Sequence, residues 1–182
     1  QEFYAPIKAN SSHIHFAFIT GITKFSQLSI FSTINNLTNI SMDPEFSTIC
    51  GITKDELDTV LKEDIALLAS KNHVSFERMR ELLRENYDGY HFSREGEDIF
   101  NPYSLMRSFA AGFIDNYWYA SGTSTYLIHQ MQHFHTDVTT LDDMFAFSSS
   151  FDRPTEKMSD ALPLLYQSGY LTIKKYDPLS NG

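Results

Sequence analysis

The chain has 182 residues, of which 42% are hydrophobic and 14% aromatic, so it can build the core of one ordinary domain or of two small ones and is not a disordered polypeptide. Its formal net charge of −9 comes from 23 acidic and 14 basic residues, which disfavours a nucleic-acid partner because phosphate binding needs clustered Lys and Arg. The sequence holds no apolar run long enough to span a membrane, and its single cysteine, Cys50, excludes a disulfide framework and a thiolate zinc site and favours a reduced, cytoplasmic setting.

A buried strand is expected near the N-terminus. Residues 13–19, HIHFAFI, alternate or run apolar and lead into Thr20 and Gly21. In α/β proteins, ligands bind beyond the carboxyl ends of such strands. Thr20, Thr23 and Lys24 offer hydroxyls and a cation that could sense a phosphate, but a solvated turn is the interpretation that loop composition favours.

Capping signals then predict one short helix and two longer ones. Asp43 before Pro44 marks the start of the short helix, and Gly51 marks its end. Residues 53–56, TKDE, form a capping box, and Ser75 caps the next helix. Apolar residues follow each cap at helical spacing, namely Leu57, Val60, Leu61, Ile65 and Leu68 in the first helix and Phe76, Met79, Leu82, Leu83 and Tyr87 in the second. The short connection between them predicts an antiparallel pair.

A small hairpin is predicted after this pair, with strands at 90–92 and 98–100 between turns at Asp88-Gly89 and Gly96. The surrounding stretches 87–92 and 116–123 are dense in aromatic residues. A base-stacking or peptide-binding face is one interpretation, but aromatic side chains that pin the hairpin between helices are favoured, because aromatic pairs contribute strongly to cores.

Two further helices and a last strand are predicted in the second half. Asn101-Pro102 opens one helix, and Thr123 or Ser124 opens another. A polar connection over 136–160 leads to a helix from Asp160 to Gln167, and residues 170–176 are expected to form a strand. Because neither the first nor the last strand has an evident partner in the sequence, both ends of the chain look cut.

No residue pattern by itself identifies an enzyme. The phosphate-binding motif GxxxxGK[ST] is absent, and no GxSxG is present. His129, His133 and His135 have the best metal-ligand spacing, but surface histidines are favoured over a zinc site because no further ligand is evident. Cys50 is expected to be a small buried residue rather than a nucleophile. The triplet Asp152, Glu156 and Lys157 is only a weak match to a D…ExK nuclease pattern, because the strands that must hold such a site are missing.

Four sequence blocks, taken in order, resemble the AAA-ATPase-like family of bacterial proteins. They are FITGITKFSQLSIFSTINNLTNIS, ICGITKDEL, YDGYHFS with IFNPYSL, and NYWYASGTSTYLI. LPLLYQSGYLTIKKYDP then resembles the family's junction toward its next domain. The resemblance implies a P-loop NTPase-like protein in which a nuclease-like domain of the PD-(D/E)XK superfamily usually follows.

The resemblance also implies a layout for this chain. The fold class is mostly α with short β elements (α+β). Residues 1–50 would be a remnant of the P-loop α/β sheet with the sensor strand, residues 51–135 a helical lid with a small hairpin, and residues 136–182 a truncated winged-helix-like module. Thr20 would be the residue nearest the γ-phosphate sensor, with Thr23 and Lys24 as runners-up. Family members often have Arg where His91 stands, and His is mostly uncharged at neutral pH.

The expected function is therefore that of a sensor-and-lid fragment that couples nucleotide state to a downstream nuclease-like domain. ATP and Mg²⁺ belong to the full-length parent, whereas the fragment is expected to hold no cofactor, no metal and no catalytic residue. Its partners would be the rest of its own chain, the P-loop core and the nuclease-like domain. The alternative is a protein- or DNA-binding winged-helix module without a nucleotide role. An independent hydrolase that uses the histidine cluster is a third, weaker hypothesis.

Overall fold

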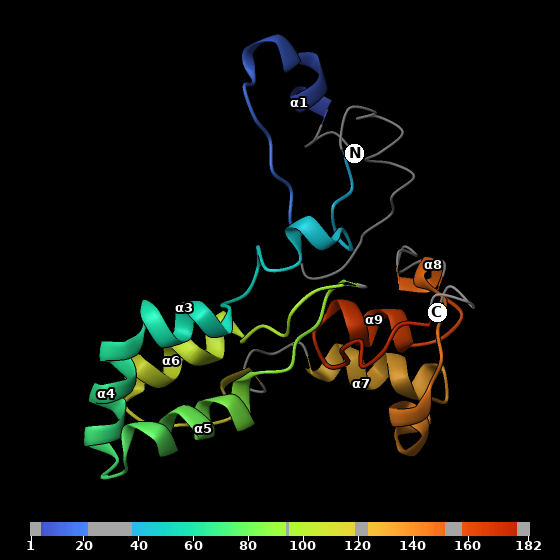
Figure 1. Cartoon of the computed structure of the whole chain (residues 1–182). Helices are drawn as coiled ribbons and strands as arrows, with labels where there is room; N and C mark the ends of the chain where they lie inside the picture. Colours follow the sequence, from blue (N-terminus) through green and yellow to red (C-terminus); the bar gives the residue numbers. More distant parts are fainter. Residues whose placement is uncertain (1–4, 22–37, 94, 119–123, 152–157, 178–182) are drawn as a thin grey trace. The chain divides into compact units, whose positions relative to one another are not determined.

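The computed structural model describes residues 5–21, 38–93, 95–118, 124–151 and 158–177. This part of the chain is rich in helices, and its β structure is limited to isolated bridges (Figure 1). The prediction of a mostly helical chain with short β elements is thus confirmed at that level. None of the described helices combines the length and apolar character that crossing a membrane requires.

The chain divides into two compact units, each assembled from separate stretches of sequence. Unit 1 comprises residues 1–39, 126–171 and 177–182, and unit 2 comprises residues 40–125 and 172–176. These limits differ from the predicted boundaries after residues 50 and 135, so the roles assigned to the three predicted domains stay predictions.

Unit 2 is a helical unit whose members begin at the predicted caps. It contains a 3-10 helix Pro44–Phe46 and the helices α3 (Lys54–Thr59), α4 (Lys62–Lys71), α5 (Phe76–Tyr87) and α6 (Pro102–Ala111). Helix α4 packs against α5 and α6, and the four ribbons lie together in Figure 1. Their shared core consists of Leu57, Ile65, Leu68, Ala69, Met79, Leu83, Tyr87, Phe100 and Leu105.

The caps of unit 2 are confirmed in detail. The Thr53 hydroxyl accepts a hydrogen bond from the Glu56 N–H at 3.1 Å, and the Glu56 carboxylate accepts from the Thr53 N–H at 2.8 Å, which completes the capping box. The side chains of Ser75 and Asn101 likewise accept hydrogen bonds from the third residues of α5 and α6. Helix α6 ends at Gly112, whose φ of 86° is in the left-handed region that glycine adopts without strain.

One predicted helix is divided in the structure. The apolar spacing from Leu57 to Leu68 predicted a single helix, but α3 ends at Thr59 and α4 begins at Lys62. The break places Val60 in solvent at 72% exposure, while Leu57 and Ile65 on either side of it are both buried. The chain therefore changes direction here so that both short helices face the same core.

Unit 1 has a smaller core at its C-terminal end. Its helices are α1 (Ala5–Ala9), α7 (Ser124–His133, whose first two residues fall in unit 2), α8 (Ser148–Phe151) and α9 (Leu162–Gln167), with 3-10 helices at Ser11–His13 and Val138–Asp143. Helix α8 packs against α9. Leu127 of α7 is buried with Ala161, Leu164 and Leu165, so α7 packs with residues that follow it in sequence.

Both predicted terminal strands are wrong within the described residues. His13 ends a 3-10 helix, and residues 14–21 have no regular secondary structure and no bridge partner in the described part of the chain. At the other end, the N–H groups of Tyr170 and Leu171 both donate to the Leu165 carbonyl, at 2.8 and 3.2 Å. These two residues wrap the end of α9 and are not available for a strand ladder, although the predicted helix stop at Gly169 is confirmed by its φ of 76°.

Candidate functional site

The structure places Thr20 and leaves the other two predicted sensing residues, Thr23 and Lys24, outside the described residues. Thr20 is exposed near the end of the segment 14–21. In the same segment Phe16, Phe18 and Ile19 are 78%, 48% and 39% exposed. The segment therefore presents apolar side chains to solvent.

The predicted hairpin is present in a minimal form. Tyr90 and Ile99 form one antiparallel bridge, in which the Tyr90 N–H donates to the Ile99 carbonyl at 3.2 Å and the Ile99 N–H donates back at 2.9 Å. Gly89, with a φ of 100°, makes the entering turn, and its N–H donates to the Asp88 carboxylate at 2.8 Å. A second bridge joins Phe100 to Ile52, so the hairpin is tied to the start of α3.

His91 contacts two other segments of unit 2 at once. Its Nδ1 lies 3.0 Å from the Asp98 carboxylate across the hairpin. Its backbone N–H donates to the Thr172 hydroxyl at 2.6 Å, and the same hydroxyl lies 3.3 Å from the His91 carbonyl, to which it donates. His91 is therefore a connecting point within this unit, and sequence reasoning missed the Thr172 contact because no motif links residues so far apart.

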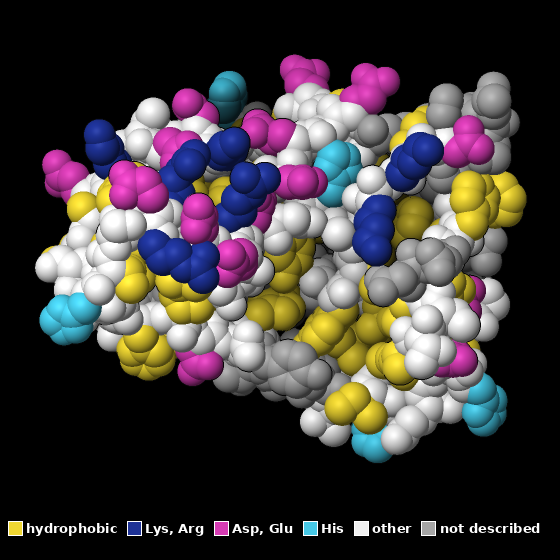
Figure 2. All heavy atoms as spheres, turned by 60° about the horizontal axis from the view of Figure 1, so that its bottom comes forward, with side chains coloured by type: hydrophobic (Ala, Val, Ile, Leu, Met, Phe, Trp, Pro, Cys, Tyr) yellow, Lys and Arg dark blue, Asp and Glu magenta, His cyan; other side chains and the backbone are white. Residues whose placement is uncertain are grey.

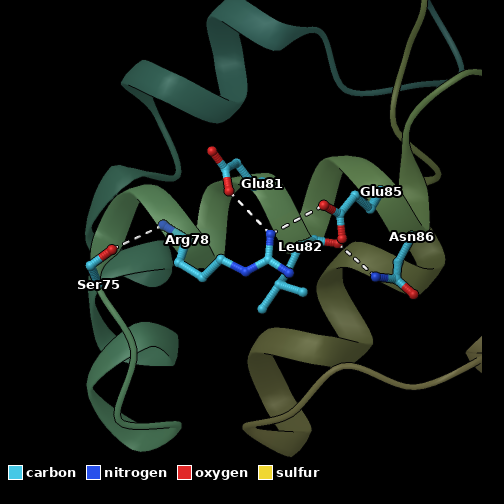
Figure 3. A network of polar contacts seen from close by, with 6 residues as sticks. All are labelled: Ser75, Arg78, Glu81, Leu82, Glu85 and Asn86. Atoms are coloured by element: carbon cyan, nitrogen blue, oxygen red, sulfur yellow. Dashed lines mark hydrogen bonds and ion pairs between the residues drawn. The ribbon is translucent and has the colours of Figure 1, made fainter.

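The arginines of α5 all have carboxylate partners. The Arg78 guanidinium lies between Glu81 and Glu85, 3.1 Å from each, as Figure 3 shows together with the cap from Ser75 and the bond from Asn86 to the Leu82 carbonyl. Arg84 lies 3.4 Å from Asp88. Arg80 donates through two nitrogens to both carboxylate oxygens of Asp58 and so joins α5 to α3.

Acidic and basic side chains are therefore mixed on the surface of unit 2. Dark blue and magenta side chains are interspersed in the left part of Figure 2, over the helices of unit 2. Because the cations of α5 are paired with carboxylates of the same unit, they do not form the uncompensated basic stripe that a polyanion needs.

Several ionisable groups are shifted by local contacts. The Arg80 guanidinium holds the pKa of Asp58 below its ordinary value, and the Thr53 N–H and hydroxyl do the same to the pKa of Glu56. Burial raises the pKa of Tyr87, whose hydroxyl donates to the Asp115 carbonyl at 2.9 Å. Each shift has a structural cause in a cap, an ion pair or burial, and none identifies a general acid or base.

The three histidines of the metal hypothesis lie at the end of α7 and just beyond it. His129, His133 and His135 are all exposed, and His135 has a φ of 51°. The described residues contain no group of three His, Cys, Asp or Glu side chains placed to hold a metal ion. An open cavity of about 400 Å³ lies on this helix end, lined by Ile128, Met131, Gln132, His135 and Thr136.

Two other sequence hypotheses have simple outcomes. Cys50 is exposed, so the expectation of a buried cysteine is wrong; it lies in the turns after the 3-10 helix Pro44–Phe46, outside the core of unit 2. The residues of the nuclease-like pattern, Asp152, Glu156 and Lys157, lie outside the described residues.

The aromatic stretches pack locally. Tyr90 and Phe92 stack at 6.3 Å between ring centroids, and Tyr87 is buried in the core of unit 2. Tyr103 of α6 meets Trp118 edge-on at 6.4 Å. The interpretation that aromatic side chains pin the hairpin fits the contacts of Tyr87, Tyr90 and Phe92, whereas residues 119–123 of the second stretch lie outside the described residues.

The chain is similar to a longer protein from Azotobacter chroococcum mcd 1, described as an uncharacterized protein in the vnfD 5' region. The two are 30% identical over 173 residues, which is 95% of this chain and 31% of that protein. The chain thus spans about a third of its relative's length. No known protein-family profile matches the chain, and no solved structure matches it.

Proposed function

We propose that the chain is the sensor-and-lid part of a bacterial AAA-ATPase-like protein. In this role it couples the nucleotide state of a P-loop core to a downstream nuclease-like domain and is not catalytic alone. The proposal rests on the resemblance of the sequence blocks and on the way in which unit 2 brings together two of them, ICGITKDEL and YDGYHFS with IFNPYSL.

The observation that carries the proposal is the hydrogen bonding between blocks that are distant in sequence. Ile52, from ICGITKDEL, exchanges two backbone hydrogen bonds with Phe100, from IFNPYSL, at 3.2 and 2.8 Å. The Asn101 N–H donates to the carbonyl of Tyr87, from YDGYHFS, at 2.9 Å. If these blocks were unrelated stretches of surface, hydrogen bonds between them would not be expected. Their assembly around one core supports a single helical element such as a lid.

Catalysis by the chain itself is not part of the proposal. Phosphoryl transfer to water needs the phosphates cradled, Mg²⁺ held and a water oriented. The 182 residues contain no GxxxxGK[ST] motif for the first task, and Thr20 alone could serve only the last. ATP and Mg²⁺ would therefore be bound by other parts of the parent protein.

The alternative of a DNA-reading winged helix has less support. A recognition helix must present polar or basic side chains to a groove. Helix α9, LPLLYQ, has no Lys or Arg, and Pro163, Leu164, Leu165 and Tyr166 are buried. We therefore propose the rest of its own chain, rather than nucleic acid, as the partner of this part.

The proposal is tested with the full-length parent protein and the substitution Thr20→Ala. If Thr20 helps to orient the attacking water, ATP hydrolysis should fall by on the order of 100-fold while ATP affinity stays unchanged. Thr20→Ser keeps the hydroxyl and should retain most of the activity. Full hydrolysis by Thr20→Ala would contradict the sensor assignment.

A second measurement concerns the 182-residue chain. Its melting temperature should not change on addition of ATP and Mg²⁺, because a ligand shifts stability only when it binds the folded state. A clear increase would mean that this chain has a nucleotide site of its own. It would contradict the proposal that other parts of the parent protein bind ATP and Mg²⁺.

A further inference from the structure

The segment after α9 returns to unit 2 and lies along the edge of its hairpin. Residues 172–176 belong to unit 2, whereas α9 and residues 170–171 belong to unit 1. We call residues 172–176 the strap. The side chain of Thr172 makes two hydrogen bonds that join the strap to the hairpin.

The geometry of the hairpin explains why this side chain is needed. Tyr90 uses both of its backbone groups in the bridge to Ile99, so the backbone groups of the next residue, His91, point to the opposite edge. An unpaired strand edge is a site for further pairing. The Thr172 hydroxyl accepts from the His91 N–H at 2.6 Å and donates to the His91 carbonyl at 3.3 Å, so one hydroxyl satisfies both groups.

The side chain of His91 makes a separate contact, with the returning arm of the hairpin. Its Nδ1 lies 3.0 Å from the Asp98 carboxylate on the returning arm, and its side chain is 18% exposed. His91 thereby joins the two arms of the hairpin through its imidazole and the strap through its backbone. Thr172 itself is exposed, so the hydroxyl can leave His91 without opening the core.

We infer that Thr172 and His91 form a releasable clasp that couples the chain after α9 to the helical unit. With the clasp closed, Thr172 holds the start of the strap on the hairpin; with it open, the strap is free to leave the edge at His91. This inference deepens the proposed coupling role by naming its contact, but the clasp itself requires no nucleotide.

The clasp is tested by Thr172→Val, which removes the hydroxyl and keeps the side-chain shape. The His91 amide should exchange with solvent about 3- to 10-fold faster, the change expected for loss of one such hydrogen bond. Trypsin should also cut faster after Lys174 and Lys175, which lie on the strap and are exposed. The readouts are amide hydrogen exchange and mass spectrometry of the released C-terminal peptide.

Two control variants isolate the hydroxyl. Thr172→Ser should behave as the unsubstituted chain, because serine can make both hydrogen bonds. Thr140→Val removes another exposed threonine hydroxyl, which donates to the Asp137 carbonyl at 3.0 Å in unit 1, and should leave the His91 amide unchanged. If valine is not accommodated, Thr172→Ala removes the hydroxyl without adding bulk and should give the same acceleration.

Unchanged exchange at His91 together with unchanged cleavage in Thr172→Val would overturn the clasp. Faster exchange that extends equally to the amide of the core residue Leu83 would also overturn it, because the hydroxyl would then support the whole unit rather than the strap. Neither measurement involves ATP, so failure of the clasp and failure of the proposed nucleotide role are separate results.

Discussion

At the scale of single residues, the ion pair of Asp58 and Arg80 is the contact with the clearest dependence on pH. It joins α3 to α5 through two hydrogen bonds, and the side chains are 32% and 41% exposed. Because the pKa of Asp58 is lowered in the folded state, its contribution is complete above the ordinary pKa of an aspartate, about 4. The contribution is lost as pH falls through the lower pKa of the folded state.

Asp58→Asn should therefore destabilise the chain at pH 7 and progressively less in acid. Because both side chains are partly exposed, the loss in the free energy of unfolding at pH 7 should be about 0.5–1 kcal/mol. Urea unfolding of both proteins at pH 7, 5 and 3 measures the difference, which should shrink below about pH 4. Glu95→Gln, which alters an exposed carboxylate of the hairpin, serves as the control. A difference that stays constant down to pH 3 would contradict this account.

Residue-scale features were predictable where their cause is local. The caps at Thr53, Ser75 and Asn101 follow from patterns of a few residues and are confirmed. The contact of Asp58 with Arg80 spans 22 positions and depends on how α3 meets α5, which no local pattern determines. The sensing role of Thr20 stays a prediction.

At the scale of elements, the approach of Gly51 to Ile99 fixes how the hairpin meets the start of α3. A Cβ added at Gly51 would lie 2.0 Å from Ile99 Cδ1 and 2.7 Å from Ile99 Cβ. The methyl group could rotate away, but the Cβ is fixed to the backbone of a residue that is 1% exposed. Glycine at this position is therefore required by close packing.

Gly51→Ala should lower the free energy of unfolding by about 1–3 kcal/mol, as overpacking does in cores. Chemical denaturation provides the measurement. The neighbouring substitution Cys50→Ala affects an exposed side chain and should change stability by less than about 0.5 kcal/mol. Equal stabilities of the two variants would show that the hairpin can move away from Gly51 at little cost.

Element boundaries were harder to predict than the existence of the elements. Apolar periodicity continues across Val60, so it could not reveal that the chain turns there to bury Leu57 and Ile65 on one core. The β-branched and aromatic residues of 170–176 favour a strand, but the end of α9 takes the N–H groups of Tyr170 and Leu171. In both places tertiary contacts decide between conformations that the local sequence allows.

At the scale of the whole molecule, the two cores share no buried residue. Leu83 belongs to the core of unit 2 and Leu164 to that of unit 1. The resemblance of the sequence blocks implied divisions after residues 50 and 135, because matching blocks place boundaries only along the chain. It could not show that unit 2 also includes residues 172–176, since that assignment depends on contacts between distant segments.

Leu83→Ala should weaken unit 2 by about 2–5 kcal/mol and accelerate amide exchange in α4 and α5, while α9 keeps its protection. Leu164→Ala should do the reverse. Leu67→Ala, at a position 56% exposed in α4, is the matched control and should have little effect. If Leu83→Ala accelerates exchange equally in both cores, the chain unfolds as one cooperative body.

The return of residues 172–176 to unit 2 has a consequence for the order in which the molecule assembles during synthesis. Residues 40–125 leave the ribosome before residues 172–176 and contain the whole core of unit 2, so this core can form early. The edge of the hairpin at His91 then stays open until Thr172 emerges, an interval on the order of seconds. During that time the nascent chain exposes a pairing edge that a chaperone, or the edge of another nascent chain, can occupy.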